Sequence, residues 1–186
     1  MRARDCSSTG PKHAAGTGDS LLDIGAGVGV LSFELLAHGL SSATLVDASP
    51  AYSSAARAEA EQRAVSARDH CRQGDLVSLD GTVEQADVVV MHRVICCYPD
   101  WASLLGRATQ LSRRVLALSY PRDQWYVRVV MALENLRRRV SGNAFRTFVH
   151  SPAAMEHVIV SAGFDRISRR RTPIWCVDAY IRREEA

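Results

Sequence analysis

The sequence has little that would mark a secreted, disulfide-bonded or membrane-spanning protein. Its five cysteines, at positions 6, 71, 96, 97 and 176, are odd in number and lack a CxxC spacing, so neither a disulfide framework nor a zinc motif is indicated. No run of about 18 apolar residues occurs, and no apolar core of a signal peptide follows the charged first residues. We therefore expect a cytoplasmic protein without stable membrane association.

Strong charge of either sign is also absent. The 23 basic residues, of which Lys12 is the single lysine, exceed the 20 acidic ones by three. Two arginine triplets, at 137–139 and 169–171, have no aromatic residues interleaved with them, so solvated faces explain them better than nucleic acid does. We expect no nucleic-acid partner.

Internal repeats and a second apolar core are lacking as well. With 186 residues, 47% of them apolar, the chain is long enough for one sizeable core. Residues 1–19 are rich in Gly, Ser, Thr and Ala, a composition that predicts a flexible tail. We expect one domain over residues 20–186.

Short apolar runs alternate with helical patterns along that domain, which predicts an α/β protein with a largely parallel sheet. The expected strands are 20–24, 43–46, 70–72, 86–91, 115–119, 166–170 and 174–181. The expected helices are 30–38, 49–63, 104–111, 124–140 and 152–162.

The helix expected at 124–140 has apolar residues at helical spacing and ends on three arginines. Its apolar positions are Tyr126, Val129, Val130, Leu133, Leu136 and Val140. We expect this face to pack in the core. The alternatives are that the helix covers a flat apolar substrate or touches a membrane surface.

The stretch LLDIGAGVG, residues 21–29, ends the first strand in a glycine-rich turn. A dinucleotide fold requires GxGxxG, but here the third glycine falls at position 29. Asp23 would also face the pyrophosphate, and like charges about 4 Å apart repel by about 4 kcal/mol at an effective dielectric constant of about 20. S-adenosylmethionine is cationic and has no phosphate, so it suits a carboxylate here. The alternative is that Asp23 merely caps the next helix.

Two further acids follow strand ends. Asp47 comes 22 residues after Gly25 and can accept hydrogen bonds from both hydroxyls of a ribose. Asp75 follows Gly74 and can accept from the amino group of an adenine. An ordinary strand-end acid and an ordinary Gly-Asp turn are the alternatives.

The runs LLDIGAGVG, TLVDASP and CRQGDL, in this order and at these separations, resemble those of class I S-adenosylmethionine-dependent methyltransferases. The resemblance covers residues 20–182 and implies a Rossmann-like, seven-stranded, mostly parallel sheet with an antiparallel last strand and helices on both faces. It also implies that S-adenosylmethionine is the cofactor. The implied cofactor contacts are Asp23, Gly25, Ala26, Gly27, Asp47, Ala48, Asp75, Leu76 and His92.

On the acceptor side, the fourth strand runs into MHRVICCYPDW. This run has neither the Asn- or Asp-Pro-Pro-aromatic motif of methyltransferases that act on nucleobase amines nor the Pro-Cys pair of those that attack pyrimidines. We therefore expect a small-molecule acceptor. The runs YPRDQWY and NAFRTFVH are similar to those of magnesium-protoporphyrin O-methyltransferases, which implies O-methylation, although that family's IHYP reads Cys96-Cys97-Tyr98-Pro99 here.

Candidates for a base or a substrate contact are His92, Cys97 and His150, with packing as the alternative role for the first two. Arg146 beside His150 could hold a carboxylate, with a solvated surface pair as the alternative. A metal site is not expected, because adjacent cysteines point apart on an extended chain and a fourth ligand is not evident. A nicotinamide oxidoreductase and an inactive S-adenosylmethionine-binding protein are the remaining functional alternatives. The sequence does not indicate an oligomeric state.

Overall fold

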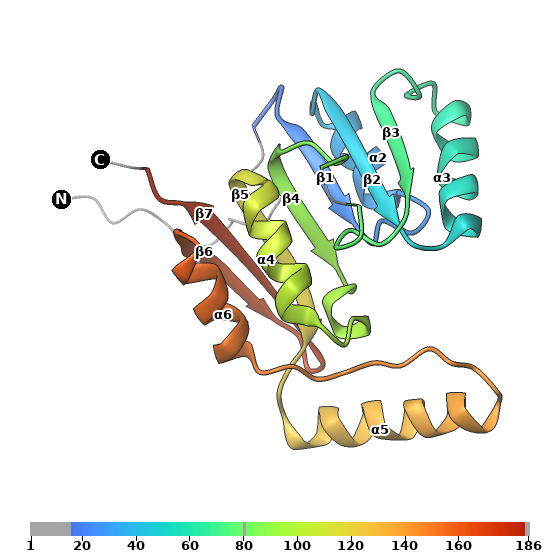
Figure 1. The fold of residues 1–186 in the computed structure, drawn as a ribbon, viewed down its shortest axis with the longest axis vertical. Coiled ribbons are helices and arrows are strands. Elements are labelled where there is room, and N and C mark those ends of the chain that lie inside the picture. Colours follow the sequence, from blue (N-terminus) through green and yellow to red (C-terminus); the bar gives the residue numbers. More distant parts are fainter. Residues whose placement is uncertain (1–15, 80, 185–186) are drawn as a thin grey trace.

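The computed structural model describes residues 16–79 and 81–184, which form a seven-stranded sheet with helices on both faces (Figure 1). The strand order is β3-β2-β1-β4-β5-β7-β6, and β7 runs antiparallel to both of its neighbours. The strands are β1 (Ser20–Ile24), β2 (Ser42–Asp47), β3 (Asp69–Gln73), β4 (Ala86–His92), β5 (Ser112–Pro121), β6 (Phe164–Arg171) and β7 (Trp175–Arg182). This confirms the predicted fold class.

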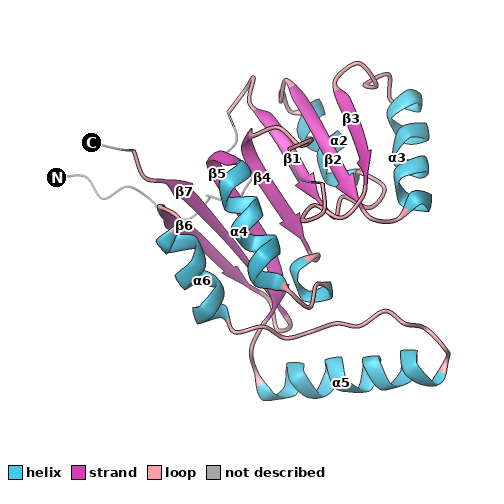
Figure 2. Cartoon of the chain, in the orientation of Figure 1, coloured by secondary structure: helices cyan, strands magenta, loops and turns pink. Residues whose placement is uncertain are grey.

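The helices begin where the sequence offers capping residues (Figure 2). Ser49 and Ser151 cap α3 and α6, and each is followed by proline at the first helical position. Asp100 caps α4 and starts it three residues before the predicted Leu104. The helices are α2 (Val30–Ala37), α3 (Pro50–Gln62), the 3-10 turn η1 (Ile95–Cys97), α4 (Trp101–Leu111), α5 (Trp125–Val140) and α6 (Pro152–Ser161).

Two apolar cores lie on opposite faces of the sheet, because successive side chains of a strand point to opposite sides. Leu21 packs in the core with α2 and α3, whereas Leu22 packs in the core with α4 and α6. Both faces of the central strands are therefore buried. The loops at the ends of these strands, and not their faces, are left to hold a ligand.

The first arginine of the 169–171 triplet does not lie on a solvated face, contrary to the prediction. Arg169 donates two hydrogen bonds of 2.7 Å to Asp178, which is fully buried and also accepts from Tyr120. Burial alone would raise the pKa of Asp178, but Arg169 and Tyr120 outweigh it and hold that pKa below its usual value. This arginine ties β6 to β7.

The helix α5 does not pack in the core, so that prediction was wrong. Figure 1 shows it beyond the carboxyl ends of the parallel strands, apart from the helices that cover the sheet. Val127 is buried, but the predicted core positions Val129, Leu133 and Leu136 are exposed. Helical spacing shows which residues share a face but not which face is buried. The strap that follows α5 (residues 143–150) packs against the polar face and not against the apolar one.

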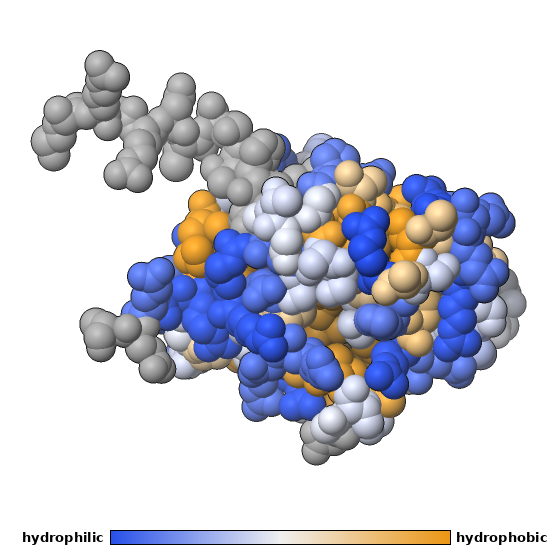
Figure 3. Space-filling model, turned by 90° about the horizontal axis from the view of Figure 1, so that it is seen from above, coloured by the Kyte–Doolittle hydropathy of each residue, from blue (hydrophilic) through white to orange (hydrophobic). Residues whose placement is uncertain are grey.

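The predicted tail 1–19 is described only in its last four residues. Gly18 donates from its backbone to Gly39, and Asp19 forms an ion pair with Arg114. None of the helices formed by the described residues has the length and apolar character needed to span a bilayer. At the end of the molecule away from α5, polar residues cover most of the surface and apolar ones show in smaller groups (Figure 3).

Candidate functional site

The glycine turn after β1 lies at the edge where the parallel strands end. Gly25 has φ of 68°, and a Cβ placed on it would lie 2.5 Å from Val94 Cγ2, so both its backbone and its surroundings require glycine. Gly27 has φ of 59°, and a Cβ there would meet nothing within 4 Å. The turn therefore packs closely at Gly25 and is open at Gly27.

Asp47, at the end of β2, holds this turn from the side. Its Oδ2 accepts a hydrogen bond of 2.9 Å from the Gly27 backbone, and its Oδ1 accepts one of 2.8 Å from the Ser49 backbone. The backbones of Gly25 and Ala26 donate to the Val46 carbonyl. The first and second strand ends are thus joined by hydrogen bonds around one carboxylate.

A pocket of about 70 Å³ opens between the ends of β1, β2 and β3. Gly25, Asp47, Ala48, Asp75 and Leu76 line it, as the sequence predicted for a shared ligand, and the lining also includes Val94 and Tyr98. The Tyr98 hydroxyl donates 2.8 Å to Asp75 Oδ2, and burial together with this carboxylate raises the pKa of Tyr98 to about 12. Tyr98 therefore stays protonated and covers the pocket next to Asp75.

Asp23 lies behind the glycine turn and does not line that pocket. It is 2% exposed, and its Oδ2 accepts a hydrogen bond of 2.8 Å from Ser32 in α2. Burial raises the pKa of Asp23 to about 7, against the smaller lowering by Ser32. Asp47 adds negative charge nearby and raises this pKa further.

His92 ends β4 and is exposed at the same edge. Its Nδ1 lies 3.1 Å from Ser119 Oγ on β5, and this oxygen also accepts 2.9 Å from the Arg93 backbone. Partial burial and the neighbouring Arg93 lower the pKa of His92, so the ring is neutral at pH 7. Arg93 has φ of 58°, and its guanidinium lies 4.5 Å from the centre of the Trp175 ring.

Cys97 and His150 lie around η1. The thiols of Cys96 and Cys97 are 3.7 Å apart, because the segment is a 3-10 turn and not the extended chain on which adjacent cysteines were expected to point apart. His150 Nε2 donates 3.1 Å to the Ile95 carbonyl, and its ring lies near those of Trp101 and Phe148. Within the described ranges, no three His, Cys, Asp or Glu side chains are placed to hold a metal ion.

Comparison with known proteins shows the family of this chain. A family model described as a methyltransferase domain matches residues 22–114, which is half of the chain and runs from within β1 to just beyond α4. The chain belongs to this methyltransferase domain family. The resemblance to class I S-adenosylmethionine-dependent methyltransferases is thereby confirmed, and the nicotinamide oxidoreductase is set aside. No curated protein matches the chain in sequence.

Solved structures share the fold of this methyltransferase at low identity. Magnesium protoporphyrin IX methyltransferase from Synechocystis PCC 6803, with bound SAH, is 20% identical with a TM-score of 0.73, over 90% of this chain and 75% of that one. An O-methyltransferase family protein from Burkholderia thailandensis is 18% identical (TM-score 0.74; 95% and 54%). A SAM-dependent methyltransferase from Methanosarcina mazei is 16% identical (TM-score 0.74; 93% and 96%).

Sequence reasoning missed the partners that orient the predicted residues of the methyltransferase. Ser32 holds Asp23, Ser119 contacts His92, and Tyr98 contacts Asp75. A signal existed only for Ser119, because it ends an expected strand that pairs with β4 and so lies beside His92 in the sheet. Ser32 and Tyr98 belong to a helix and a loop whose orientation the sequence does not reveal.

Proposed function

We propose that this methyltransferase binds S-adenosylmethionine between the ends of β1, β2 and β3 and transfers its methyl group to an oxygen of a small molecule, preferentially a carboxylate. The observation that carries the proposal is the pocket in which the glycine turn, Asp47 and Asp75 come together beside the end of β4. His92 is exposed at that strand end.

The residues present fit this cofactor. The charged residues that line the pocket, among those described, are Asp47 and Asp75, both acidic. They suit a cationic ligand and oppose a diphosphate. Gly27 leaves open space for a ligand to approach the backbone, and each carboxylate oxygen of Asp47 can accept a second hydrogen bond from a ribose hydroxyl. When bound, S-adenosylmethionine supplies an electrophilic methyl group.

The protein's main task is then to orient the acceptor. Orientation of this kind can be worth effective molarities of about 10⁵ M or more. Gly25 and Gly27 shape the turn, Asp47 fixes it to β2, and Asp75 lies where an adenine amino group can donate. Asp23, behind the turn, adds a carboxyl group whose ionised form a nearby cation would favour.

We assign the contact with the acceptor to His92, and the tautomer with its proton on Nε2 suits a carboxylate. Ser119 is buried, its oxygen already accepts from Arg93, and its single proton has His92 Nδ1 within reach. When Ser119 donates this proton to Nδ1, the proton of the neutral ring is on Nε2, which can donate to an acceptor oxygen. A carboxylate needs no base, whereas a phenol would need His92 to take a proton. Cys97 remains a candidate for an acceptor contact.

O-methylation of a small molecule also agrees with what some structures of this fold are named for. One is a magnesium protoporphyrin IX methyltransferase and another belongs to an O-methyltransferase family. These names support the class of acceptor atom that we propose, and the acceptor itself is a matter for experiment.

The test begins with ligand binding to the intact chain. S-adenosylhomocysteine at about 100 times its dissociation constant should stabilise the protein by about 2.7 kcal/mol, whereas NADH should not. A crystal structure with S-adenosylhomocysteine should then place adenosine against Asp47 and Asp75, with the sulfur facing the end of β4. Stabilisation by NADH alone, or a ligand bound elsewhere, would refute the cofactor site.

The acceptor is tested separately with radiolabelled S-adenosylmethionine and a panel of carboxylic acids, phenols and amines. We expect label to appear in base-labile methyl esters. Label in amines would refute O-methylation. A protein that binds the cofactor and methylates nothing in the panel or in cell extracts would instead be the inactive binding protein.

A further inference from the structure

An apolar stripe runs the length of α5 and is not covered by any described residue. Its members recur every three or four positions and are 50–83% exposed, which places them on one side of the helix. We call these residues the α5 stripe: Trp125, Val129, Leu133, Leu136 and Val140. A contiguous apolar surface of this kind usually marks an interaction site.

The opposite side of α5 faces the rest of the protein. Val127 is fully buried there, and Asn135 exchanges two hydrogen bonds with the Thr147 backbone, of 2.7 and 2.9 Å. Arg138, one turn further on, donates 2.9 Å to the Thr147 hydroxyl. An acceptor held between α5 and the strand ends would therefore meet this side and not the α5 stripe, so substrate binding does not account for the stripe.

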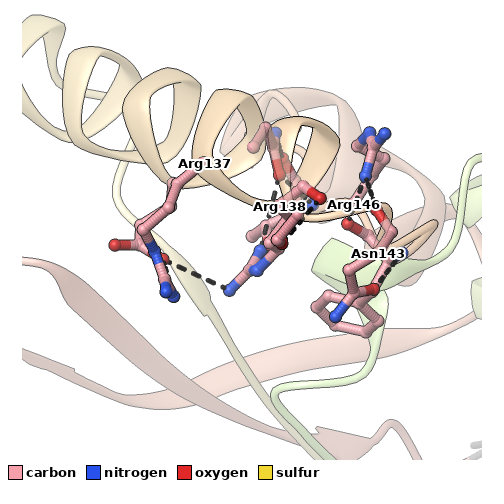
Figure 4. Close-up of polar contacts among 9 residues, drawn as sticks. Arg137, Arg138, Asn143 and Arg146 are labelled. Atoms are coloured by element: carbon pink, nitrogen blue, oxygen red, sulfur yellow. Dashed lines mark hydrogen bonds and ion pairs between the residues drawn. The ribbon is translucent and has the colours of Figure 1, made fainter.

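The stripe is flanked by arginines. Arg128 and Arg139 lie along one flank and Arg137 along the other, as helical spacing requires. Arg128 pairs with Asp123 and Arg137 with Glu134, while the side chain of Arg139 has no hydrogen bond or ion pair among the described residues. The helix has five charged residues, of which four are arginines and one is a glutamate. Figure 4 shows Arg137 and Arg138 together near the end of α5, with Asn143 and Arg146 in the strap.

The position of α5 leaves this side accessible to a flat partner. Figure 1 shows the helix as the outermost element at its end of the molecule, lying across the direction of the strands. A plane could touch it along its whole length without meeting the sheet or the other helices. The opposite end of the molecule, in Figure 3, has no comparable long apolar stripe on its described surface.

We propose that the α5 stripe docks the protein reversibly on an anionic lipid surface. An amphipathic helix with Trp and Leu on one side and arginines beside them has the composition of helices that lie in the plane of a membrane interface. The apolar side chains would enter the boundary between headgroups and acyl chains, and Arg128, Arg137 and Arg139 would meet lipid phosphates. Trp125 at the start of the helix suits this boundary.

A second copy of the chain fits the same stripe less well. If two α5 helices paired through their stripes in antiparallel orientation, Arg128 of each helix would come near Arg139 of the other. Like charges directly opposite each other destabilise such pairing. Anionic headgroups have the complementary charge, which is why we favour lipid.

The experiment uses the full chain with vesicles of phosphatidylcholine containing about 30% phosphatidylglycerol, and with phosphatidylcholine alone, at about 0.15 M salt. We expect co-sedimentation with the anionic vesicles at least tenfold stronger than with the neutral ones. The double variant Leu133→Glu, Leu136→Glu should lose it. The control Val160→Glu places one such charge on an exposed apolar position of α6 and should bind as the wild type does.

A charge variant separates attraction by the arginines from apolar contact alone. Arg137→Gln with Arg139→Gln should weaken binding to the anionic vesicles roughly tenfold or more, because each arginine near such a surface contributes roughly fivefold. All variants must keep the unfolding midpoint and S-adenosylhomocysteine affinity of the wild type, so that a loss of vesicle binding does not come from a damaged fold. Because no acceptor is used, the test is independent of the proposed acceptor.

Three results would overturn the proposal. The first is no binding to anionic vesicles. The second is binding that survives the Leu133→Glu, Leu136→Glu substitution. The third is a dimer, measured by light scattering at the concentrations used, that this double variant dissociates and that does not bind vesicles, since the stripe would then belong to a second copy.

Discussion

The two halves of this methyltransferase differ in how they make their sites. From β1 to β4, the pocket is formed by a glycine turn and by two acids, Asp47 at the end of β2 and Asp75 after β3, so that backbone geometry and a few side chains suffice. From β5 to α6, the side where we propose that the acceptor binds is bounded by α5 and the strap, whose positions rest on side-chain hydrogen bonds such as those of Asn135. The comparison teaches that a short sequence pattern can specify the cofactor side, whereas the other side depends on tertiary contacts that the pattern does not contain.

The sharpest way to break this comparison is to add one methyl group in the cofactor half. Gly25→Ala should abolish S-adenosylhomocysteine binding, or weaken it at least 100-fold, because alanine is strained at φ of 68° and its Cβ would meet Val94. Calorimetry measures the affinity. The control Gly106→Ala adds the same group in α4, where it meets nothing within 4 Å, and should bind normally. Equal affinities would show that the turn need not be glycine.

Burial of Asp23 should appear as a pH-dependent cost in stability. Because folding raises the pKa of this carboxyl to about 7, the folded state keeps a proton that the unfolded chain loses above pH 4, so stability falls as pH rises from about 4 to 7. Asp23→Asn removes this cost. The free energy of unfolding gained by the variant should therefore grow from pH 5 to pH 8, to on the order of 4 kcal/mol.

Urea unfolding at several pH values, without cofactor, measures this gain. The control Asp165→Asn changes a carboxyl group whose side chain is 64% exposed, and we expect only a small change in the free energy of unfolding. If the curves of Asp23→Asn and wild type ran parallel, the buried carboxyl would not be titrating in this window.

Asp47 should matter less than the turn it supports. Asp47→Ala removes the acceptor for Gly27 and for the ribose hydroxyls, so we expect S-adenosylmethionine to bind at least tenfold more weakly. Asp123→Ala, in the acceptor half, is the control and should leave calorimetric affinity unchanged. Retained affinity in Asp47→Ala would remove this residue from the site.

In the acceptor half, Asn135→Ala should loosen the strap without touching the cofactor. The two hydrogen bonds to Thr147 would be lost, so amide hydrogen exchange in the strap and in α5 should accelerate roughly tenfold. Arg137→Ala, on the same helix but directed to solvent, serves as the control. A fall in cofactor affinity of Asn135→Ala would show that the two halves are not separable.

The smallest effect is expected where the halves meet. Tyr98→Phe removes the hydroxyl that donates to Asp75, which frees that carboxylate oxygen for an adenine amino group. We expect S-adenosylhomocysteine to bind about two- to fivefold more tightly, by calorimetry. Tyr126→Phe, whose hydroxyl bonds to the Pro173 carbonyl instead, should have no effect. Weaker binding in Tyr98→Phe would mean that the hydroxyl itself contacts the ligand.

The sequence predicted the half from β1 to β4 better than the half from β5 to α6. Alternating strands and helices, and an acid at or just after the end of each of the first three strands, were enough to predict the sheet and five of the eleven residues that line the pocket, because parallel strands end at one edge. The periodicity of α5 predicted a helix but not its neighbours, since Asn135 and Arg138, and not its apolar residues, attach it to the strap. Asp23 was expected in the pocket, and Ser32 holds it behind the turn.

Two attachments of the strap are independent of the strap's own side chains. Asn135 bonds to the main chain of residue 147, and the backbone of Phe148 donates 2.6 Å to the main-chain carbonyl of Cys96. Neither bond uses a strap side chain. Substitution of the side chains of residues 147 and 148 would therefore leave these two attachments of the strap in place.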